Sequence, residues 1–321
     1  MRVAFVWDWD NEPTQLMTWE DGLAAALPLI GEQVQLDCYT QMRGITKRTP
    51  VKHPYVTFFA YPDWGSMARD IREGNYDAYL FFADLTRPAL IELAGEKPTA
   101  LCFTGGWAVS SASDNIALYF VESQVYLDRF RREGRNVVQA FGTNTRLFRP
   151  LPKQQKSFDA IFPATFADWK RHALFAKVTE KYKLRTMACG WMQDHEPWCY
   201  NDCFEAGVLT LPHLPNYALP FFYAAAHSCV ITSNAAGGSQ RTVLEAMACN
   251  TPVIAMKDSD KCSEYINECG IGYVVDPEPL AIADAIKTIK YTKETGGREY
   301  IMSKWTERHY ANAIVQGLKS L

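Results

Sequence analysis

The stretch 229–256, CVITSNAAGGSQRTVLEAMACNTPVIAM, limits the possible folds of this chain more than any other segment. Residues 229–233 and 252–256 are short, apolar and rich in β-branched side chains, which is typical of buried strands. Between them lie a loop of small residues, 234–238, and a segment with helical character, 242–249. A strand, a glycine-bearing loop, a helix and a second strand in this order predict one βαβ unit of a parallel sheet.

The loop and the helix start of this unit are suited to an anion. Gly237, Gly238 and Ser239 let the backbone approach a ligand, and the first amide groups of the helix point toward it. Glu245, further along the helix, offers a carboxylate that can accept hydrogen bonds from a sugar diol. These features together indicate a nucleotide site. An alternative stays open, because glycine loops before helices are common and Glu245 lies four residues after Arg241, at the spacing of an ordinary surface ion pair.

The same string resembles the donor-binding core of GT-B glycosyltransferases, especially retaining glycosyltransferase family 4 (glycosyl transferases group 1). In that family a glutamate and a Gly-Phe-Gly-type turn precede the pattern LLEAMA-G-PVIA, and a second glutamate lies within the pattern. Here VLEAMACNTPVIA matches closely, with Glu245 in the place of the second glutamate and Gly237 in the place of the first. The resemblance implies that Glu245 anchors the ribose of a nucleotide-sugar. Gly237 is a departure at a position that in the family lies near the transferring sugar.

Other segments are similar to the same family. In residues 116–150, Ser123 and the run 141–150 follow the order of a family segment that enters the interdomain linker. In residues 208–233, His213 falls in the loop that lies near the nucleobase in such enzymes, although a lone histidine is more often a packing or capping residue. The resemblance covers residues 116–321 well and residues 1–115 only in layout.

Two adjacent cations, Lys170 and Arg171, hold the place of the cations with which the family grips the donor diphosphate. The Gly-Arg part of the family segment is replaced by Ala164 and Thr165. Two cations at a helix start lie beside the positive end of the helix dipole, which is unfavourable unless an anion is bound there. The sequence therefore predicts a phosphate contact at this helix start.

The first strand, residues 2–7, is expected to be short and buried and to end in DWDNEPTQ rather than in the family's glycine-rich loop. Asp8-Trp9-Asp10 matches the Asp-x-Asp metal signature of GT-A glycosyltransferases, but that motif follows several strands, so its position here counts against a GT-A enzyme. We expect Trp9 to stack on an acceptor sugar and Asp8 and Asp10 to accept hydrogen bonds from its hydroxyls. The alternative is an acidic turn with a packed tryptophan.

Four further segments of the first half, 34–39, 55–60, 78–83 and 99–103, have the composition of strands and alternate with helical segments. This alternation predicts a parallel, doubly wound sheet. The last of these strands runs into a Gly105-Gly106 turn followed by Trp107, and ligands of open α/β sheets bind at such strand ends. We place these three residues with the acceptor, although such turns also serve only to reverse the chain.

The chain of 321 residues is too long for one modest core and predicts two domains. Residues 151–157 are polar and read as a linker. We expect an acceptor-binding Rossmann-like domain over 1–150 and a nucleotide-sugar-binding Rossmann-like domain over 151–297. After a hinge at Gly296-Gly297, a helix over 298–321 is expected to cross back to the first domain. The resemblance implies that this α/β architecture is GT-B, with two doubly wound domains facing across a cleft.

Composition excludes several classes of protein. The net charge of −3 gives no general attraction to nucleic acid or to an anionic membrane. No apolar run approaches the roughly 20 residues of a membrane-spanning helix, and the N-terminus does not resemble a signal peptide. The nine cysteines lie in apolar contexts and fit reduced thiols of a cytoplasmic protein. His195, Cys199 and Cys203 could share a helical face, but Pro197 and the lack of an evident fourth ligand argue against a metal site.

The resemblance implies transfer of a sugar from a nucleotide-diphosphate sugar to a hydroxyl of a glycan or another acceptor, with retention of configuration and without metal or cofactor. The leaving diphosphate needs fixed positive charge and N–H dipoles where its charge develops. In a front-face course the leaving phosphate takes the acceptor proton, whereas an inverting enzyme would need a base such as Asp8 or Asp10. The expected donor residues are Thr165, Lys170, Arg171, Gly190, His213, Gly237, Gly238, Ser239, Gln240, Arg241, Thr242 and Glu245, and Lys170, Arg171 and Glu245 have catalytic roles.

Three alternatives to this function remain open on sequence grounds. The motifs would also fit a glycosyltransferase that modifies phage or viral nucleic acid, although the charge of the chain does not support a nucleic-acid acceptor. They would fit a nucleotide-sugar epimerase. A catalytically silent nucleotide-sugar-binding protein is the third alternative, because Gly237 replaces the first glutamate of the family.

Overall fold

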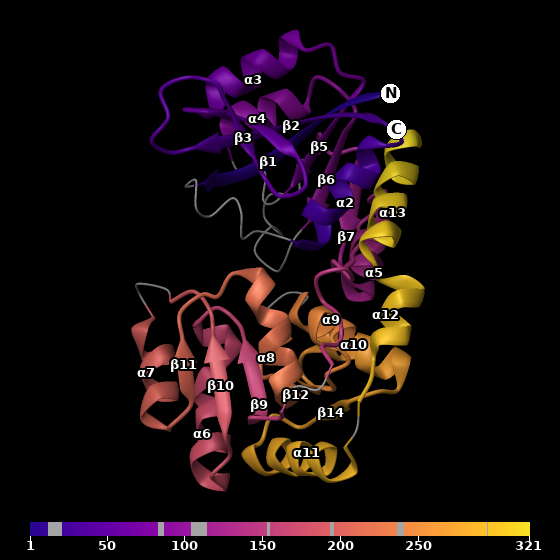
Figure 1. Cartoon of the computed structure of the whole chain (residues 1–321). Helices are drawn as coiled ribbons and strands as arrows, with labels where there is room; N and C mark the ends of the chain where they lie inside the picture. The colour runs from indigo at the N-terminus through magenta and orange to yellow at the C-terminus, as the bar shows by residue number, and fades with distance from the viewer. Residues whose placement is uncertain are drawn as a thin grey trace. The chain divides into compact units, whose positions relative to one another are not determined.

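The computed structural model describes residues 1–11, 21–82, 87–103, 114–152, 155–192, 196–235, 241–293 and 295–321, without the side chains of residues 8–11 and 21. The chain forms two compact units, which are described separately. Unit 1 consists of Met1–Gly142 and Glu307–Leu321, and unit 2 consists of Thr143–Thr306. Each unit is built around one sheet with helices packed against it (Figure 1).

The sheet of unit 1 has the strand order β3-β4-β2-β1-β5-β6-β7-β8 in the described part of the chain. Its strands are β1 (Arg2–Asn11), β2 (Gln35–Met42), β3 (Thr49–Lys52), β4 (Thr57–Tyr61), β5 (Ala78–Phe82), β6 (Thr99–Phe103), β7 (Leu118–Val121) and β8 (Val137–Gln139). Neighbouring strands are parallel except β3, which pairs antiparallel with β4 and which the sequence did not predict. The order reverses direction at β1, so the predicted doubly wound sheet is confirmed.

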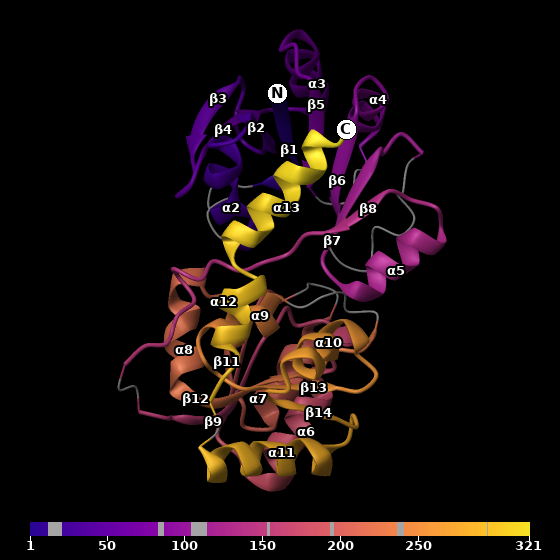
Figure 2. The same cartoon turned by 90° about the vertical axis from the view of Figure 1, so that its right-hand side faces the viewer.

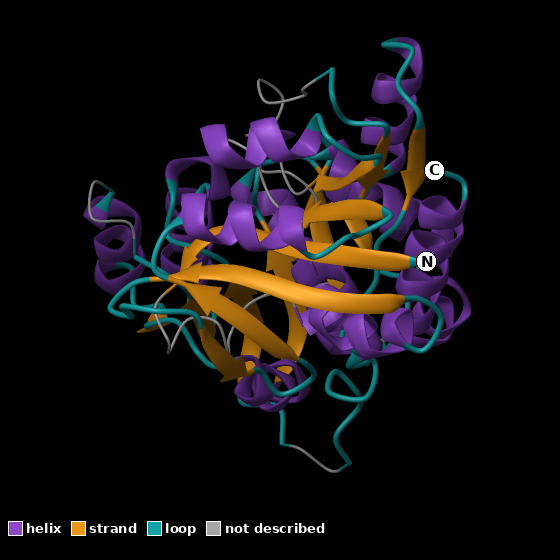
Figure 3. Cartoon of the chain, turned by 90° about the horizontal axis from the view of Figure 1, so that it is seen from above, coloured by secondary structure: helices purple, strands orange, loops and turns teal. Residues whose placement is uncertain are grey.

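Strand β1 shows why helices cover both faces of this sheet. Val3, Phe5 and Trp7 belong to one buried core, and Ala4 and Val6 belong to the other, because successive side chains of a strand point to opposite faces. The first core also takes residues from α2 (Asp21–Gly31) and α13 (Glu307–Lys319), which lie along one another (Figure 2). The second core takes residues from α3 (Trp64–Glu73), α4 (Pro88–Ala94) and α5 (Gln124–Arg132). The strands therefore lie between two helical layers (Figure 3).

Strand β1 is longer than predicted. The sequence reading ended it at Trp7 and placed Asp8, Trp9 and Asp10 in a loop. In the structure the strand continues to Asn11 after a register shift between Trp7 and Asp10. It continues because β2 is also long and supplies Gln41 and Met42 as further backbone partners, and a bulge of this kind accommodates the shift.

The sheet of unit 2 has the order β11-β10-β9-β12-β13-β14, and all its pairs are parallel. Its strands are β9 (Phe158–Pro163), β10 (Thr186–Cys189), β11 (Leu209–Leu211), β12 (Ala226–Ile231), β13 (Val253–Met256) and β14 (Tyr273–Val275). Its helices are α6 (His172–Tyr182), α7 (Pro197–Glu205), α8 (Leu219–Ala225), α9 (Arg241–Ala248), α10 (Asp260–Cys269), α11 (Pro279–Thr292) and α12 (Arg298–Lys304). The βαβ unit predicted for 229–256 is present as β12, α9 and β13, with β12 and β13 adjacent and parallel.

The structure divides the chain after Gly142, whereas the sequence reading placed the boundary after residue 150. The amide of Thr143 donates to the carbonyl oxygen of Trp305 (2.9 Å), and the Arg298 guanidinium donates to the carbonyl oxygen of Phe148 (3.0 Å). These hydrogen bonds tie residues 143–150 to the rest of unit 2. No helix among the described residues has both the length and the apolar character needed to cross a bilayer.

The segment after residue 295 also differs from its prediction. Gly296 and Gly297 are not a hinge between the units, because both lie inside unit 2. A Cβ atom on Gly297 would lie 2.7 Å from the Cβ of Met247, and the backbone φ of Gly297 is 100°, so close packing and a left-handed backbone require glycine here. The expected single helix over 298–321 is two helices, α12 in unit 2 and α13 in unit 1, and the chain passes between units after Thr306.

Candidate active site

The predicted donor residues of unit 2 follow the carboxyl ends of successive parallel strands. Because all the strands run in one direction, these ends lie at one edge of the sheet, where ligands of such sheets bind. Thr165, Lys170 and Arg171 follow β9, Gly190 follows β10, His213 follows β11, and Arg241, Thr242 and Glu245 follow β12. Gly237, Gly238, Ser239 and Gln240 lie outside the described residues, so their predicted roles stay predictions.

Lys170 is half-buried at the end of a short 3-10 turn, Asp168–Lys170. Burial, together with the positive charges of Arg241 and Lys261, lowers the pKa of its ammonium group to about 8. Arg241 begins α9, and Lys261 lies in the first turn of α10 and is only 7% exposed. Three cations therefore gather near the starts of two helices. An anion such as a diphosphate would be stabilised there by both charges and helix dipoles.

Arg171, the second predicted cation, is held differently. Its Nη1 and Nη2 donate to the two carboxylate oxygens of Asp258 (2.6 and 2.8 Å), and this contact lowers the pKa of Asp258. Its Nε donates to the carbonyl oxygen of Thr232 (2.5 Å), and Nη2 also donates to that of Ser233 (3.0 Å). These bonds use four of the five N–H donors of a guanidinium. Arg171 therefore ties the end of β12, where the glycine loop begins, to the residues after β13.

Glu245 is not the exposed ion-pair partner of the alternative reading, because it is only 8% exposed. The hydroxyl of Tyr223 donates to its Oε2 (3.0 Å). Three buried thiols also surround it: Cys189, Cys229 and Cys249 have their pKa values raised by burial and then by the charge of Glu245. A carboxylate in such surroundings is costly unless its oxygens are hydrogen-bonded. Tyr223, which the sequence reading missed, supplies one of those bonds.

An aromatic pair lies at the same edge of the sheet. The indole of Trp191, which follows β10, stacks on the imidazole of His213, with ring centroids 4.3 Å apart and planes 16° from parallel. Burial, and then the charge of Arg241, lowers the pKa of His213. Trp191 remains 41% exposed, so the pair offers a flat surface to a ligand. The sequence analysis counted Gly190 as a donor residue but did not count Trp191 as a site residue.

Comparison with known proteins gives a match for unit 2 and for the fold of the whole chain. Residues 143–298, nearly all of unit 2, match the family model described as Glycosyl transferases group 1. Unit 2 therefore carries a glycosyl transferases group 1 domain, and the chain has the GT-B fold of glycosyltransferases. No curated protein matches its sequence.

Solved structures of glycosyltransferases share the fold over the full chain. Sucrose-phosphate synthase from Thermosynechococcus elongatus is similar with a TM-score of 0.75 and 16% identity, covering 100% of this chain and 99% of that one. Anabaena HepE in complex with UDP and glucose has a TM-score of 0.72 and 16% identity, with 100% of each chain covered. AviGT4, a glycosyltransferase involved in avilamycin A biosynthesis, has a TM-score of 0.68 and 13% identity, covering 99% and 97%. At these identities the likeness shows the fold alone.

Two other predicted donor residues of the glycosyltransferase shape the sheet edge. A Cβ atom on Gly190 would lie 1.9 Å from the carbonyl oxygen of Ala164, so only glycine lets the end of β10 approach the segment after β9. That segment includes Thr165, which is half-buried. The hydroxyl of Thr242 donates to the carbonyl oxygen of Pro163 (3.1 Å) and fixes the start of α9 to β9. The contacts of Gly190 and Thr242 account for their presence without a ligand.

The predicted acceptor residues of the glycosyltransferase lie partly or wholly outside the described part of the structure. The backbones of Asp8, Trp9 and Asp10 form the carboxyl end of β1, but their side chains lie outside the described part of the structure. Gly105, Gly106 and Trp107 lie outside it as well. Glu122, which the sequence reading missed, is a buried carboxylate, 5% exposed, at the carboxyl end of β7.

The cysteine pair considered for a metal lies on α7. Cys199 and Cys203 are buried, and burial raises their pKa values to about 11 and about 12, so both thiols are protonated at neutral pH. His195 lies outside the described residues. Among the residues that the structure does describe, no three histidine, cysteine or acidic side chains are grouped to hold a metal ion.

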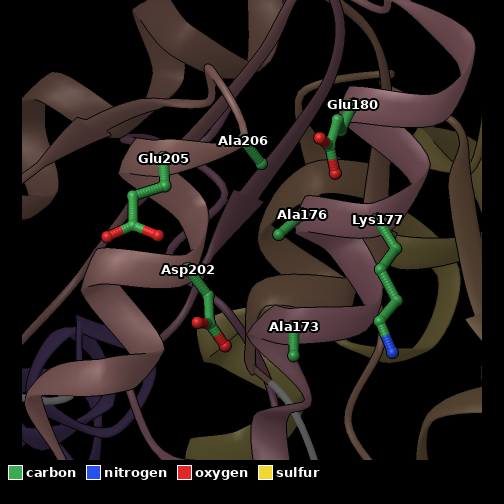
Figure 4. A pocket seen from close by; sticks show the side chains of 7 residues that line it. All are labelled: Ala173, Ala176, Lys177, Glu180, Asp202, Glu205 and Ala206. Carbon is green, nitrogen blue, oxygen red and sulfur yellow. The ribbon is translucent and has the colours of Figure 1, made fainter.

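A pocket between α6 and α7 is separate from the candidate site. Figure 4 shows Asp202 and Glu205 of α7 on one side of it and Lys177 and Glu180 of α6 on the other. The remaining lining residues are alanines, and none of the predicted donor residues is among them. We therefore assign the donor to the strand ends and not to this pocket.

Proposed function

We propose that this glycosyltransferase moves a sugar from a nucleotide-diphosphate sugar to an acceptor hydroxyl, with retention of configuration and without a metal ion. The observation that carries the proposal is the group of three cations, Lys170, Arg241 and Lys261, at the same sheet edge as the buried carboxylate of Glu245. The structure of Anabaena HepE in complex with UDP-glucose supports a donor of the UDP-sugar class.

Each part of the donor has a matching group in unit 2. The diphosphate lies against Lys170, Arg241 and the first amides of α9, and Arg171 positions the loop before that helix. Glu245 accepts hydrogen bonds from the ribose hydroxyls. The exposed face of the Trp191–His213 pair stacks on the nucleobase. Predicted donor residues 237–240 complete the diphosphate contacts in this proposal.

The cations also account for catalysis. When the bond to the sugar breaks, negative charge grows on the leaving diphosphate, and preorganised cations stabilise that charge most where water is excluded. Lys170 is suited to this role because its ammonium group is partly withdrawn from water, where its attraction to an anion is stronger than at the surface. In a retaining front-face reaction the leaving phosphate accepts the proton of the acceptor hydroxyl, so the proposal requires no side chain as general base.

The acceptor is proposed to be a glycan or another hydroxyl-bearing molecule bound by unit 1. Asp8, Trp9, Asp10, Gly105, Gly106 and Trp107 remain the proposed contacts. Trp9→Ala and Trp107→Ala should weaken the use of acceptor while the dissociation constant of the nucleotide stays nearly unchanged. An equal loss of donor binding would assign these residues to the fold or to the donor instead.

The proposal is tested by titrating the protein with UDP, GDP, ADP and dTDP in a calorimeter, with and without EDTA. We expect one diphosphate to bind with at least about tenfold preference and EDTA to leave its affinity unchanged. Turnover of the matching nucleotide-sugar with an acceptor panel, followed by NMR of the anomeric proton, then reports the configuration of the product. Loss of binding on adding EDTA would contradict the metal-free site, and an inverted product would contradict retention.

A further inference from the structure

Tyr223 and Glu245 come from different helices and meet in the interior of unit 2. The tyrosine lies on α8 and is fully buried, and the glutamate lies on α9. The hydroxyl of Tyr223 is 3.0 Å from Oε2 of Glu245. Burial, and then the charge of Glu245, raises the pKa of this hydroxyl, so it keeps its proton and acts as a donor to the carboxylate.

The ring of Tyr223 is itself held in place. Thr251 donates through its hydroxyl to the carbonyl oxygen of Tyr223 (2.9 Å). The ring of Phe148 meets the tyrosine ring edge-on, with centroids 6.2 Å apart and planes at 68°. Arg298 donates to the carbonyl oxygens of both Phe148 and Ala248, so one guanidinium connects the segment carrying Phe148 to the end of α9. The hydroxyl therefore stands at a fixed point relative to the helix that carries Glu245.

A fixed donor is significant because Glu245 is flexible by nature. A glutamate side chain has several rotatable bonds, and recognition of a diol requires its oxygens to be placed to within about 0.5 Å. The thiols of Cys189, Cys229 and Cys249 around it are weak hydrogen-bond donors and cannot orient a carboxylate strongly. A carboxylate has about four acceptor positions, so a bond from Tyr223 is compatible with bonds from a ligand.

We propose that Tyr223 is the positioning residue for ribose recognition: its hydroxyl holds the carboxylate of Glu245 in the orientation that accepts the ribose diol of the donor. This inference rests on the proposed function, in which Glu245 binds the ribose. Tyr223 does not touch the nucleotide. Its contribution to affinity passes entirely through Glu245.

The test is a double-mutant cycle on nucleotide affinity. Tyr223→Phe keeps the ring and its packing against Phe148 but removes the hydroxyl. We expect the dissociation constant of UDP, or of whichever diphosphate the wild type prefers, to rise roughly tenfold, as for a hydrogen bond to a charged group. In a Glu245→Gln background the same change should have less than about a twofold effect, because the two residues act as a unit.

Two further measurements separate positioning from a general structural role. The matching 2′,3′-dideoxynucleoside diphosphate lacks the diol, so Tyr223→Phe should not weaken its binding. In turnover, the KM for the nucleotide-sugar should rise while kcat stays within about twofold of wild type, since the lost interaction is uniform binding. Tyr265→Phe is the matched control, because Tyr265 is a fully buried tyrosine of the same unit that packs on Trp305. It should leave nucleotide affinity unchanged.

The outcomes are distinct. If the wild type binds no nucleoside diphosphate, the proposed function fails. If the wild type binds but the two substitutions are additive, or the dideoxy compound loses as much affinity as the ribonucleotide, only the role of Tyr223 is overturned. Should Tyr223→Phe not fold, Tyr223→p-aminophenylalanine places an N–H donor at the same point. That variant should keep near-wild-type affinity if a donor is what Glu245 needs, and a tenfold loss in it would overturn the inference.

Discussion

Arg171 binds both carboxylate oxygens of Asp258, with Nη1–Oδ2 and Nη2–Oδ1 distances of 2.6 and 2.8 Å. The contact joins the start of α6 to the segment after β13, and the same guanidinium holds two carbonyl groups at the end of β12. Lys170, the preceding residue, is half-buried beside two other cations. Two neighbouring cations of one sequence motif therefore have different surroundings: Arg171 supports the site, and Lys170 is the proposed contact of the anion.

Arg171→Lys should lower the free energy of unfolding by about 1–3 kcal/mol. A lysine cannot make the paired bonds to a carboxylate or reach both carbonyl groups, so several hydrogen bonds to a charged group are lost. Urea unfolding followed by tryptophan fluorescence measures the change. Asp258→Asn is the matched variant, and it should cost less, since Asp258 is about half exposed and the carbonyl contacts of Arg171 remain. If Arg171→Lys were as stable as the wild type, the bonds of Arg171 would be unimportant for the fold.

Lys170→Met should lower the affinity for the nucleotide without lowering the stability of the fold. The variant loses the desolvation cost of a charged amine, so it should be about as stable as the wild type at pH 7. Its affinity for the nucleoside diphosphate should fall by roughly tenfold or more, because a charge-assisted contact is lost. Thermal melting and calorimetric titration of the same samples separate the two effects. A variant that lost stability but kept its affinity would remove Lys170 from the proposed site.

Nucleotide affinity should also depend on pH through Lys170. Its pKa is lowered to about 8, so the amine loses its proton as the pH rises from 7 to 9, and a bound diphosphate favours the protonated form. Affinity should therefore fall above pH 8, and binding near pH 8 should take up a proton. Calorimetry in two buffers of different ionisation enthalpy measures that uptake. Lys170→Arg, which keeps its charge throughout, should show neither effect, and identical behaviour of the two proteins would contradict the assignment.

Acid should destabilise unit 2 through His172. Its ring is fully buried between those of Phe162 and Phe166, at centroid distances of 4.8 and 4.6 Å, and burial lowers its pKa to about 3. The neutral ring is favoured in the fold, while the unfolded chain takes up a proton below about pH 6.5. The contribution of the neutral His172 ring to the free energy of unfolding is therefore complete above pH 6.5 and is lost as the pH falls toward 3.

Urea unfolding at pH 7.5 and at pH 4.5 tests this dependence. The wild type should lose up to about 1.4 kcal/mol per pH unit through His172 below pH 6.5. His172→Phe should have a flatter profile in that window. His53→Phe is the control variant, because His53 is a second buried histidine and lies in unit 1. Burial lowers its pKa to about 4. Parallel pH profiles for the wild type and His172→Phe would show that this ring does not govern acid stability.

The sequence predicts the parts of the site that depend on the order of elements along the chain. The resemblance to the family assigned Lys170, His213 and Glu245 to one donor site, and in the structure each of them follows a parallel strand at the same sheet edge. Contacts between elements distant in sequence were not predictable in this way. The Tyr223–Glu245 bond and the Arg171–Asp258 pair depend on how helices pack, and no local pattern encodes that packing.

The same reason explains the errors in the fold. The length of β1 is set by its neighbour β2 rather than by its own residues. The boundary near residue 142 is set by hydrogen bonds to Arg298 and Trp305, more than a hundred residues later in the chain. Gly297 was predicted to be a hinge because glycine occurs both in flexible backbone and in closely packed backbone. Only the position of Met247 in the fold shows that Gly297 is closely packed.

Trp191→Ala should weaken nucleotide binding without changing the fold. Stacking of a base on an aromatic side chain is worth roughly 1–3 kcal/mol, so the dissociation constant of the preferred nucleoside diphosphate should rise about five- to a hundredfold. Inorganic pyrophosphate lacks a base and should bind the variant and the wild type equally, whereas Lys170→Met should weaken the binding of both ligands. Trp198→Ala is the matched control, because Trp198 is a similarly exposed indole, 50% against 41%, on α7. Calorimetric titration with both ligands decides the matter: equal losses for pyrophosphate and nucleotide would mean that Trp191 supports the diphosphate site and does not stack on the base.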